Sequence, residues 1–261
     1  MNYNLPILAY HKVEFQKELG VTSISPRKFE KQVSFLKQAG YTSILPQSLF
    51  EQTNAVKPIL ITFDDGYEGA YKYVYPLLKG CGFTATVFLT TGYVGNYNRW
   101  DASPGPRFMH LNWSQIRKMS DDGICFGSHG VNHVFLTRRS TETIRYELKT
   151  SKKMLEDRTG KPVQFFSYPY GDYNNKIIEL VHEAGYDAAF SLQPEILRVS
   201  ETANCRYMLP RIAIYCIDSM SAFKSKIGDA NNGALFYVQK MKNRLINKCS
   251  YAAMVVERLR K

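Results

Sequence analysis

The stretch Pro58-Ile59-Leu60-Ile61-Thr62-Phe63-Asp64-Asp65-Gly66 places two adjacent carboxylates directly after an apolar run of strand type. Like charges this close repel, and each raises the pKa of the other unless a positive group lies beside them. A metal ion is the usual remedy. Polar residues at the end of a buried strand are typical of parallel α/β folds, in which the chemistry lies where strands meet their following loops.

Short apolar runs alternate with helical patterns on both sides of this stretch. Leu5 to Tyr10 is predicted to be a strand, and Ser25-Pro26 has the N-cap and first-turn residues that begin a helix. Strands separated by helices indicate parallel βαβ units. Further helices are expected over 69–79 (stopped by Gly80), 112–122, 141–158 and 174–183, and further strands over 42–45, 85–90, 124–126, 165–167, 187–191 and 207–215.

The composition is that of a globular protein with a basic balance. The chain has 261 residues, 34 Lys and Arg against 23 Asp and Glu, and a net charge of +11. This net charge favours acidic partners. No nucleic-acid-binding module is recognisable, so nucleic acid is not expected to be a partner. The N-terminal residues lack a signal-peptide pattern, and the five scattered cysteines are expected to be buried free thiols, so a cytoplasmic protein is predicted.

The last part of the chain is expected to be a separate basic, amphipathic helical tail. Residues 231–261 hold seven Lys or Arg against one Glu, which gives +6 of the total +11. We divide the chain into a catalytic domain over 1–218 and this tail over 219–261. Two interpretations stay open: a helix that docks on the domain with a solvated basic face, or a helix that contacts a partner or a membrane surface, such as the inner membrane.

A metal site is predicted from three residues. His129 and His133 stand four positions apart in Ser128-His129-Gly130-Val131-Asn132-His133, and Asp65 is the third candidate ligand. One carboxylate and two imidazoles form a ligand set for a catalytic divalent metal with an open position. Zinc is the first choice, with Ni²⁺, Co²⁺ and Fe²⁺ as alternatives. Asp64 is then left to take a proton from metal-bound water.

Three segments resemble the first motifs of the polysaccharide deacetylases, the nodulation-protein-B-like carbohydrate esterase family 4. They are Thr62-Phe63-Asp64-Asp65-Gly66, the histidine segment Ser128 to His133, and Ser167-Tyr168-Pro169-Tyr170-Gly171. The resemblance covers about Leu5 to Tyr215. It implies an α/β fold, a distorted (β/α) barrel of about seven strands, here with a C-terminal helical extension. It also implies hydrolysis of an N-acetyl group on an amino sugar.

The resemblance implies roles for single residues. Asp64 matches the general base, and Asp65, His129 and His133 match the metal ligands. Pro169 and Tyr170 match the residues of one groove wall, with the Tyr170 backbone N–H on the oxyanion. The family's usual Arg before this motif is replaced by Ser167, and its late catalytic His is missing.

The missing groups suggest the branch that includes the biofilm poly-N-acetylglucosamine deacetylases, in which the motif order is permuted. His11, at the end of the first strand, then becomes the general acid, with His110 as the other candidate. Arg211, in Leu209-Pro210-Arg211-Ile212, is expected to replace the missing Arg beside Asp64. An ordinary structural Arg is the alternative.

The loop over 92–110 is a candidate substrate wall because sugar rings pack on aromatic side chains. Tyr93 and Trp100 are its predicted substrate contacts. The alternative is that the aromatic residues cover the end of the barrel.

We therefore predict a metal-dependent N-deacetylase of an N-acetylglucosamine-type amino sugar. The substrate is expected to be a nucleotide-linked or lipid-linked precursor of a surface polysaccharide or glycolipid. Two rivals stay open: an amidohydrolase of the same fold that acts on a non-sugar amide, and a non-catalytic sugar-binding module.

Overall fold

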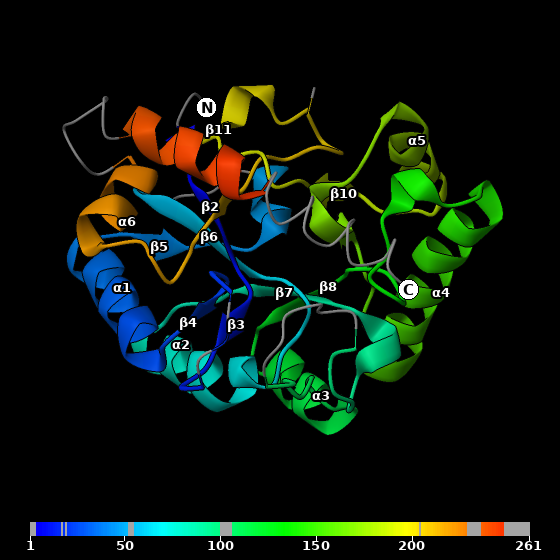
Figure 1. The fold of residues 1–261 in the computed structure, drawn as a ribbon, viewed down its shortest axis with the longest axis horizontal. Coiled ribbons are helices and arrows are strands. Elements are labelled where there is room, and N and C mark those ends of the chain that lie inside the picture. The colour runs from blue at the N-terminus through cyan, green and yellow to red at the C-terminus, as the bar shows by residue number, and fades with distance from the viewer. Residues whose placement is uncertain are drawn as a thin grey trace.

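The computed structural model describes residues 4–16, 18, 20–51, 55–99, 106–203, 205–228 and 236–247. A curved sheet of parallel strands forms its centre, in the order β10-β9-β8-β7-β6-β2-β12, and β5 also pairs with β6. The helices lie around the outside of this sheet (Figure 1). The strands are β2 (Ile7–Tyr10), β5 (Thr42–Ser43), β6 (Pro58–Phe63), β7 (Thr86–Leu89), β8 (Cys125–Ser128), β9 (Phe165–Ser167), β10 (Ala188–Phe190) and β12 (Ile212–Ala213). Two short pairs lie apart from it, β1 (Asn4–Leu5) with β11 (Leu197–Arg198) and β3 (Lys12–Val13) with β4 (Ser23–Ile24).

The sheet curls almost into a ring because one segment bonds to both of its edges. Leu209 forms a parallel bridge to Phe190 of β10, and its N–H donates to the Ala189 carbonyl at 2.9 Å. A few residues later, Ile212 of β12 lies opposite Leu8 of β2. This confirms the expected α/β barrel of about seven strands.

The expected strand over 207–215 is wrong in its length, since only Ile212–Ala213 is a strand and Leu209 adds a single bridge. The segment changes its partner from β10 to β2 between these points, and Pro210 there has no N–H to donate to either strand. A continuous ladder is therefore impossible.

Alternation along the strands divides the core into two layers. Ile59, Ile61 and Phe63 belong to the cluster that packs against the helices, whereas Leu60 belongs to a second cluster. Because successive strand residues point to opposite faces, Thr62 shares the face of Leu60, inside the curve of the sheet. The inner cluster also includes Phe88, Phe165 and Phe190.

The helices begin where their capping residues predict. Side chains of Ser25, Asn112 and Asn174 accept hydrogen bonds from the first turns of α1, α3 and α5, and Asn112 forms a capping box with Gln115. The helices are α1 (Pro26–Gln38), α2 (Tyr75–Cys81), α3 (Trp113–Asp121), α4 (Thr141–Thr159), α5 (Asn175–Glu183) and α6 (Met220–Lys226).

The expected stop of the second helix at Gly80 is wrong. A π-helical turn over Ala70–Val74 leads into α2, which passes through Gly80 and ends at Cys81. Gly82 terminates it with a φ of 72°. A glycine inside a helix costs only about 1 kcal/mol relative to alanine, whereas a left-handed C-cap specifically favours glycine.

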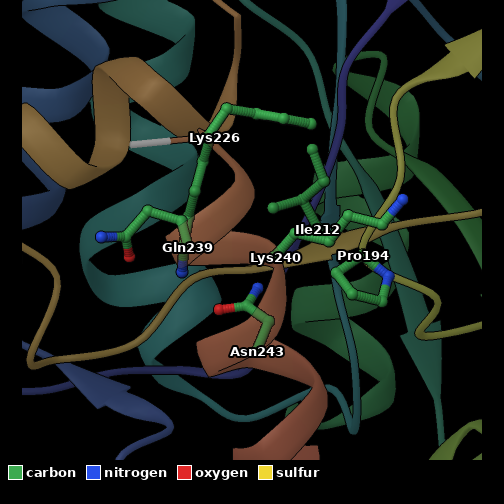
Figure 2. A pocket seen from close by; sticks show the side chains of 7 residues that line it. Pro194, Ile212, Lys226, Gln239, Lys240 and Asn243 are labelled. Carbon is green, nitrogen blue, oxygen red and sulfur yellow. The ribbon is translucent and has the colours of Figure 1, made fainter. Parts of the chain in front are cut away.

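The C-terminal helical part packs on the barrel through polar contacts. Within residues 236–247, which are helical, Asn243 Nδ2 donates to the Ala213 carbonyl and Asn247 Nδ2 to the Leu192 carbonyl, each at 2.9 Å. A small pocket remains between this helix and Ile212, and Gln239 and Asn243 face it (Figure 2).

The same helix turns its apolar residues outward. Tyr237, Val238, Met241 and Leu245 are 63%, 56%, 46% and 64% exposed. Residues 248–261, the remainder of the expected tail, lie outside the described residues. Among the described helices, none combines the length and the apolar character needed to cross a membrane.

Candidate active site

Asp64 and Arg211 form a buried ion pair at the end of β6. Nη1 of Arg211 donates to Oδ1 at 2.7 Å and Nη2 donates to Oδ2 at 2.8 Å, and both side chains are at most 1% exposed. Burial by itself raises the pKa of Asp64. The nearby charges of Arg211 and His129 and the Arg211 hydrogen bonds outweigh burial, so this pKa lies below its usual value. Asp64 is therefore an ionised carboxylate of fixed orientation.

Arg211 lies inside the curved sheet with every N–H of its guanidinium used. Besides Asp64, it donates to the Ser191 carbonyl (3.0 Å), Thr62 Oγ1 (3.1 Å) and Ser167 Oγ (2.7 Å). Its guanidinium carbon lies 5.4 Å from the centre of the Phe88 ring. The small side chain of Ser167, in the place where the family motif usually has Arg, thus binds a guanidinium that comes from elsewhere in the chain.

Asp65, His129 and His133 come together as a candidate metal centre. One ligand atom from each lies within 4.8 Å of the others, and all three residues are buried. Nε2 of His133 is 3.2 Å from Asp65 Oδ1 and that of His129 is 3.6 Å from the same oxygen. Among the described atoms, this buried oxygen has no hydrogen-bond partner. A buried, unpaired carboxylate oxygen facing two imidazole nitrogens fits a divalent cation.

Hydrogen bonding and burial prepare His129 for metal binding. Its Nδ1 lies 2.7 Å from the Ser167 carbonyl, which can only accept, so Nδ1 carries the proton and Nε2 keeps its lone pair. Burial lowers the pKa of His129 to about 4. The imidazole is therefore neutral at physiological pH, the form that binds metals.

Backbone strain is concentrated at this site. In the described chain, the non-glycine residues with positive φ are Asp65 (71°), His133 (52°) and Tyr170 (60°). A left-handed conformation at such residues costs of order 1–3 kcal/mol each and persists only where surrounding contacts hold it. These are two of the candidate ligands and the residue expected to bind the oxyanion.

The two acid candidates both lie near the carboxylates. His11 follows β2, and its charge is close enough to lower the pKa of both Asp64 and Asp65. Its Nδ1 is buried without a hydrogen-bond partner among the described residues. Nδ1 of His110 lies 3.0 Å from the backbone carbonyl of Asp65, and burial lowers its pKa to about 4. His110 is thus bound through Nδ1 to the backbone of the ligand loop, whereas Nδ1 of His11 makes no such contact.

The expected substrate contacts are only partly placed. Pro169 is buried, and the Tyr170 ring stacks on Phe135 at 3.9 Å and meets the His133 ring edge-on at 4.3 Å. Tyr93 lies 5.9 Å from the His110 ring. Trp100 lies outside the described residues.

Glu147 of α4 was not among the residues expected at the site. It is 1% exposed, and its carboxylate accepts hydrogen bonds from the backbone of Val131 and Asn132, between the two histidines. The available sequence signal was an acidic residue on the apolar face of a helix, in step with Ile144, Leu148 and Ser151.

The barrel and the strand-end site define a class of protein, and sequence comparison gives the same class. A sequence model of the family described as polysaccharide deacetylase matches residues 51–189. The chain belongs to the polysaccharide deacetylase family.

Particular relatives extend this match. The chain is 30% identical over 192 residues to the protein named as polysaccharide deacetylase YxkH of Bacillus subtilis (strain 168), covering 73% of this chain and 65% of YxkH. It is 30% identical over 169 residues to the poly-beta-1,6-N-acetyl-D-glucosamine N-deacetylase of Staphylococcus aureus (strain MSSA476), covering 60% and 54%. The solved structure of the Streptococcus pyogenes deacetylase PplD in complex with acetate superposes with a TM-score of 0.73 at 26% identity, over 85% of this chain and 96% of PplD.

Proposed function

We propose that this chain is a metal-dependent N-deacetylase of an amino sugar of N-acetylglucosamine type. The observation that carries the proposal is the pairing of an ionised, immobilised Asp64 with an adjacent Asp-His-His cation site. A binding module has no use for a buried carboxylate held ionised beside a metal site. The chain spans about two thirds or less of the length of the two curated relatives described above. The proposed activity is therefore argued from the geometry of the site and requires a direct test.

Asp65, His129 and His133 would hold the metal, and Zn²⁺ suits this donor set, as do Ni²⁺, Co²⁺ and Fe²⁺. A divalent ion bound there supplies Lewis-acid activation of water and of the acetyl carbonyl.

The protein's own groups would then handle the proton. Asp64 accepts a proton from the attacking water, and Arg211 keeps it ionised and aimed. His11 donates a proton to the leaving amine of the sugar. The backbone N–H of Tyr170 would stabilise the developing oxyanion, and Pro169 would form part of the groove wall beside it. Tyr93 and Trp100 remain our candidates for contacts with the sugar ring.

We place the reaction on a precursor of a surface polysaccharide or glycolipid, linked to a nucleotide or a lipid. The net charge of +11 suits the diphosphate that either linkage carries. The four described cysteines, Cys81, Cys125, Cys205 and Cys216, are all free thiols, which fits the reducing cytoplasm.

The outward face of helix 236–247 supports peripheral contact with an anionic membrane. Val238, Met241 and Leu245 follow helical spacing on that face. Residues 231–261 carry an excess of six positive charges, and within the described part Lys240, Lys242 and Arg244 pair with Glu195 and Asp218 of the domain. Each Lys or Arg near an anionic surface contributes about 1 kcal/mol to binding. The double variant Met241→Glu, Leu245→Glu should lose sedimentation with vesicles of phosphatidylcholine and phosphatidylglycerol. Tyr146→Glu, at a 52% exposed position on α4, is the matched control.

The direct test of the function is acetate release from a panel of free, nucleotide-linked and lipid-linked N-acetylamino sugars, with simple amides included. We expect release from at least one sugar conjugate, loss of release with a chelator, and recovery on adding Zn²⁺ or Co²⁺. Turnover of simple amides alone would favour the non-sugar amidohydrolase. Sugar binding without acetate release from any conjugate would favour the binding module.

A further inference from the structure

The carboxylate of Glu147 lies beneath the loop that joins the two candidate metal-binding histidines. Its Oε2 accepts the backbone N–H of Val131 at 2.6 Å and that of Asn132 at 2.9 Å, and its Oε1 accepts Nδ2 of Asn132 at 2.7 Å. Successive backbone N–H groups that converge on one oxygen form an anion-binding concavity. The helix therefore supplies, from its own side chain, the anion that orders this loop.

The fit between the loop and Glu147 is close. A Cβ on Gly130, where φ is +79°, would lie 2.9 Å from Glu147 Oε2. No Lys, Arg or His lies within ion-pair distance of the Glu147 carboxylate in the part of the chain that the structure describes. Burying a charge is expensive unless hydrogen bonds compensate it, and here the compensating donors all belong to the loop.

The same helix holds the loop at a second point, one turn further on. Ser151 Oγ lies 2.7 Å from Ser128 Oγ, which in turn accepts the N–H of Gly130 at 3.1 Å. On the opposite side, the backbone N–H groups of Thr91 and Gly92 donate to the carbonyls of Gly130 and Val131, each at 3.0 Å. The loop amides are thus bound by α4 and its carbonyls by the segment after β7.

This arrangement accounts for the strained conformation of His133. Its φ of 52° persists because the residues before it are fixed on both sides, and that conformation brings Nε2 to 3.2 Å from Asp65 Oδ1. Without the Glu147 carboxylate, the amides of Val131 and Asn132 lose their acceptor and the loop is free to relax.

We propose that Glu147 is a positioning residue for the metal centre: it fixes the spacing of His129 and His133 and thereby sets the affinity of the site for its cation. The inference rests on the metal site of the proposed function. Loss of an outer hydrogen-bond partner of metal ligands typically costs 10- to 100-fold in metal affinity.

The test uses the full chain, stripped of metal, with Zn²⁺ affinity measured by competition with a chromophoric chelator. Glu147→Gln keeps the shape but removes the charge and turns one acceptor into a donor that faces N–H groups. We expect Zn²⁺ binding 10- to 100-fold weaker than in the original chain, and a changed visible absorption spectrum of the Co²⁺ form. Asp157→Asn, on the exposed side of the same helix and paired with Lys153, is the matched control and should bind normally.

A Zn²⁺ affinity of Glu147→Gln within twofold of the original chain would overturn the proposal, even if the melting temperature fell. If that variant does not fold, Glu147→Asp keeps the charge but shortens its reach to the backbone N–H groups of Val131 and Asn132, and an unchanged affinity there would equally overturn the proposal. Absence of Zn²⁺ binding in the original chain would instead contradict the metal site itself.

Discussion

Arg211 donates two parallel hydrogen bonds, 2.7 and 2.8 Å long, to the carboxylate of Asp64, although the two residues are 147 positions apart in the chain. Two-pronged pairs of guanidinium and carboxylate fix orientation as well as charge. One Arg therefore controls whether the proposed base is ionised, where it points, and how costly it is to bury.

Replacing Asp64 with Asn should lower the rate of deacetylation by roughly 10²–10⁴-fold, because the amide cannot accept the proton that the carboxylate takes. Zinc content should stay at the level of the original chain, since Asp65 and not Asp64 belongs to the metal cluster. Acetate release and metal analysis on the same sample measure both effects. Near-normal turnover by this variant would show that another group is the base.

Replacing Arg211 with Met should destabilise the fold by about 3–5 kcal/mol, because Asp64 is left buried without its counter-charge. Adding Asp64→Asn should recover part of this loss, since the neutral amide does not need a cation. Urea denaturation of the two single variants and the double variant gives the coupling between the residues. Simple additivity would mean that the pair contributes no coupling free energy.

The ion pair should also make stability depend on pH. The folded-state pKa of Asp64 lies below its ordinary value of 3.8, so the stabilisation is present above that value and is lost as pH falls through the folded pKa. The free energy of unfolding of the original chain should therefore decline below about pH 4 more steeply than that of Asp64→Asn. Denaturation series between pH 7 and 3 compare the two slopes, and identical slopes would show that Asp64 titrates equally in both states.

The two histidine candidates should separate by their effects on rate. His11→Ala should reduce kcat by roughly 10²–10⁴-fold, as expected for loss of a general acid. The loss of kcat in His11→Ala should be smaller for substrates with a more acidic leaving group, because such a group needs less protonation. His110→Ala should instead weaken metal binding, because His110 contacts the backbone of Asp65. The acid role passes to His110 if its removal, and not that of His11, shows the leaving-group dependence.

Metal binding should stabilise the folded chain. A site filled at 100 times its Kd adds about 2.7 kcal/mol to the free energy of unfolding. The melting temperature should therefore rise on adding Zn²⁺ to the metal-free chain and fall again with a chelator. Asp65→Ala should remove this response, while Asp157→Asn should retain it.

The sequence predicts those parts of the site that depend on local pattern. Strand ends, caps and the Asp-His-His spacing are local, and Asp65, His129 and His133 do meet after β6 and β8. The expectation for Arg211 came from resemblance, since no local pattern shows that a long side chain reaches across the inside of a barrel. Its five hydrogen bonds go to four residues in three separate segments, and only the closed sheet brings them together.

The sequence does not predict which face of the C-terminal helix packs on the barrel, because its periodicity shows an apolar face but not the direction in which that face points. The spacing of Val238, Met241 and Leu245 shows an apolar face but not whether it meets the barrel. The hydrogen bonds of Asn243 and Asn247 to backbone carbonyls decide this, with the polar face inward. Glu147 is hidden for a similar reason: a lone acidic residue on an apolar helical face has no visible partner until the loop lies above it.

Arg211 lies later in the chain than the other residues of the candidate site. As the chain leaves the ribosome, both carboxylates and both metal-binding histidines emerge well before the residue that neutralises Asp64. The segment from Leu209 to Ala213 both closes the sheet between β10 and β2 and carries the cation that pairs with Asp64. Closure of the sheet and pairing of Asp64 with Arg211 therefore depend on the same segment. A chain truncated before residue 211 should have no deacetylase activity, not merely a lower rate.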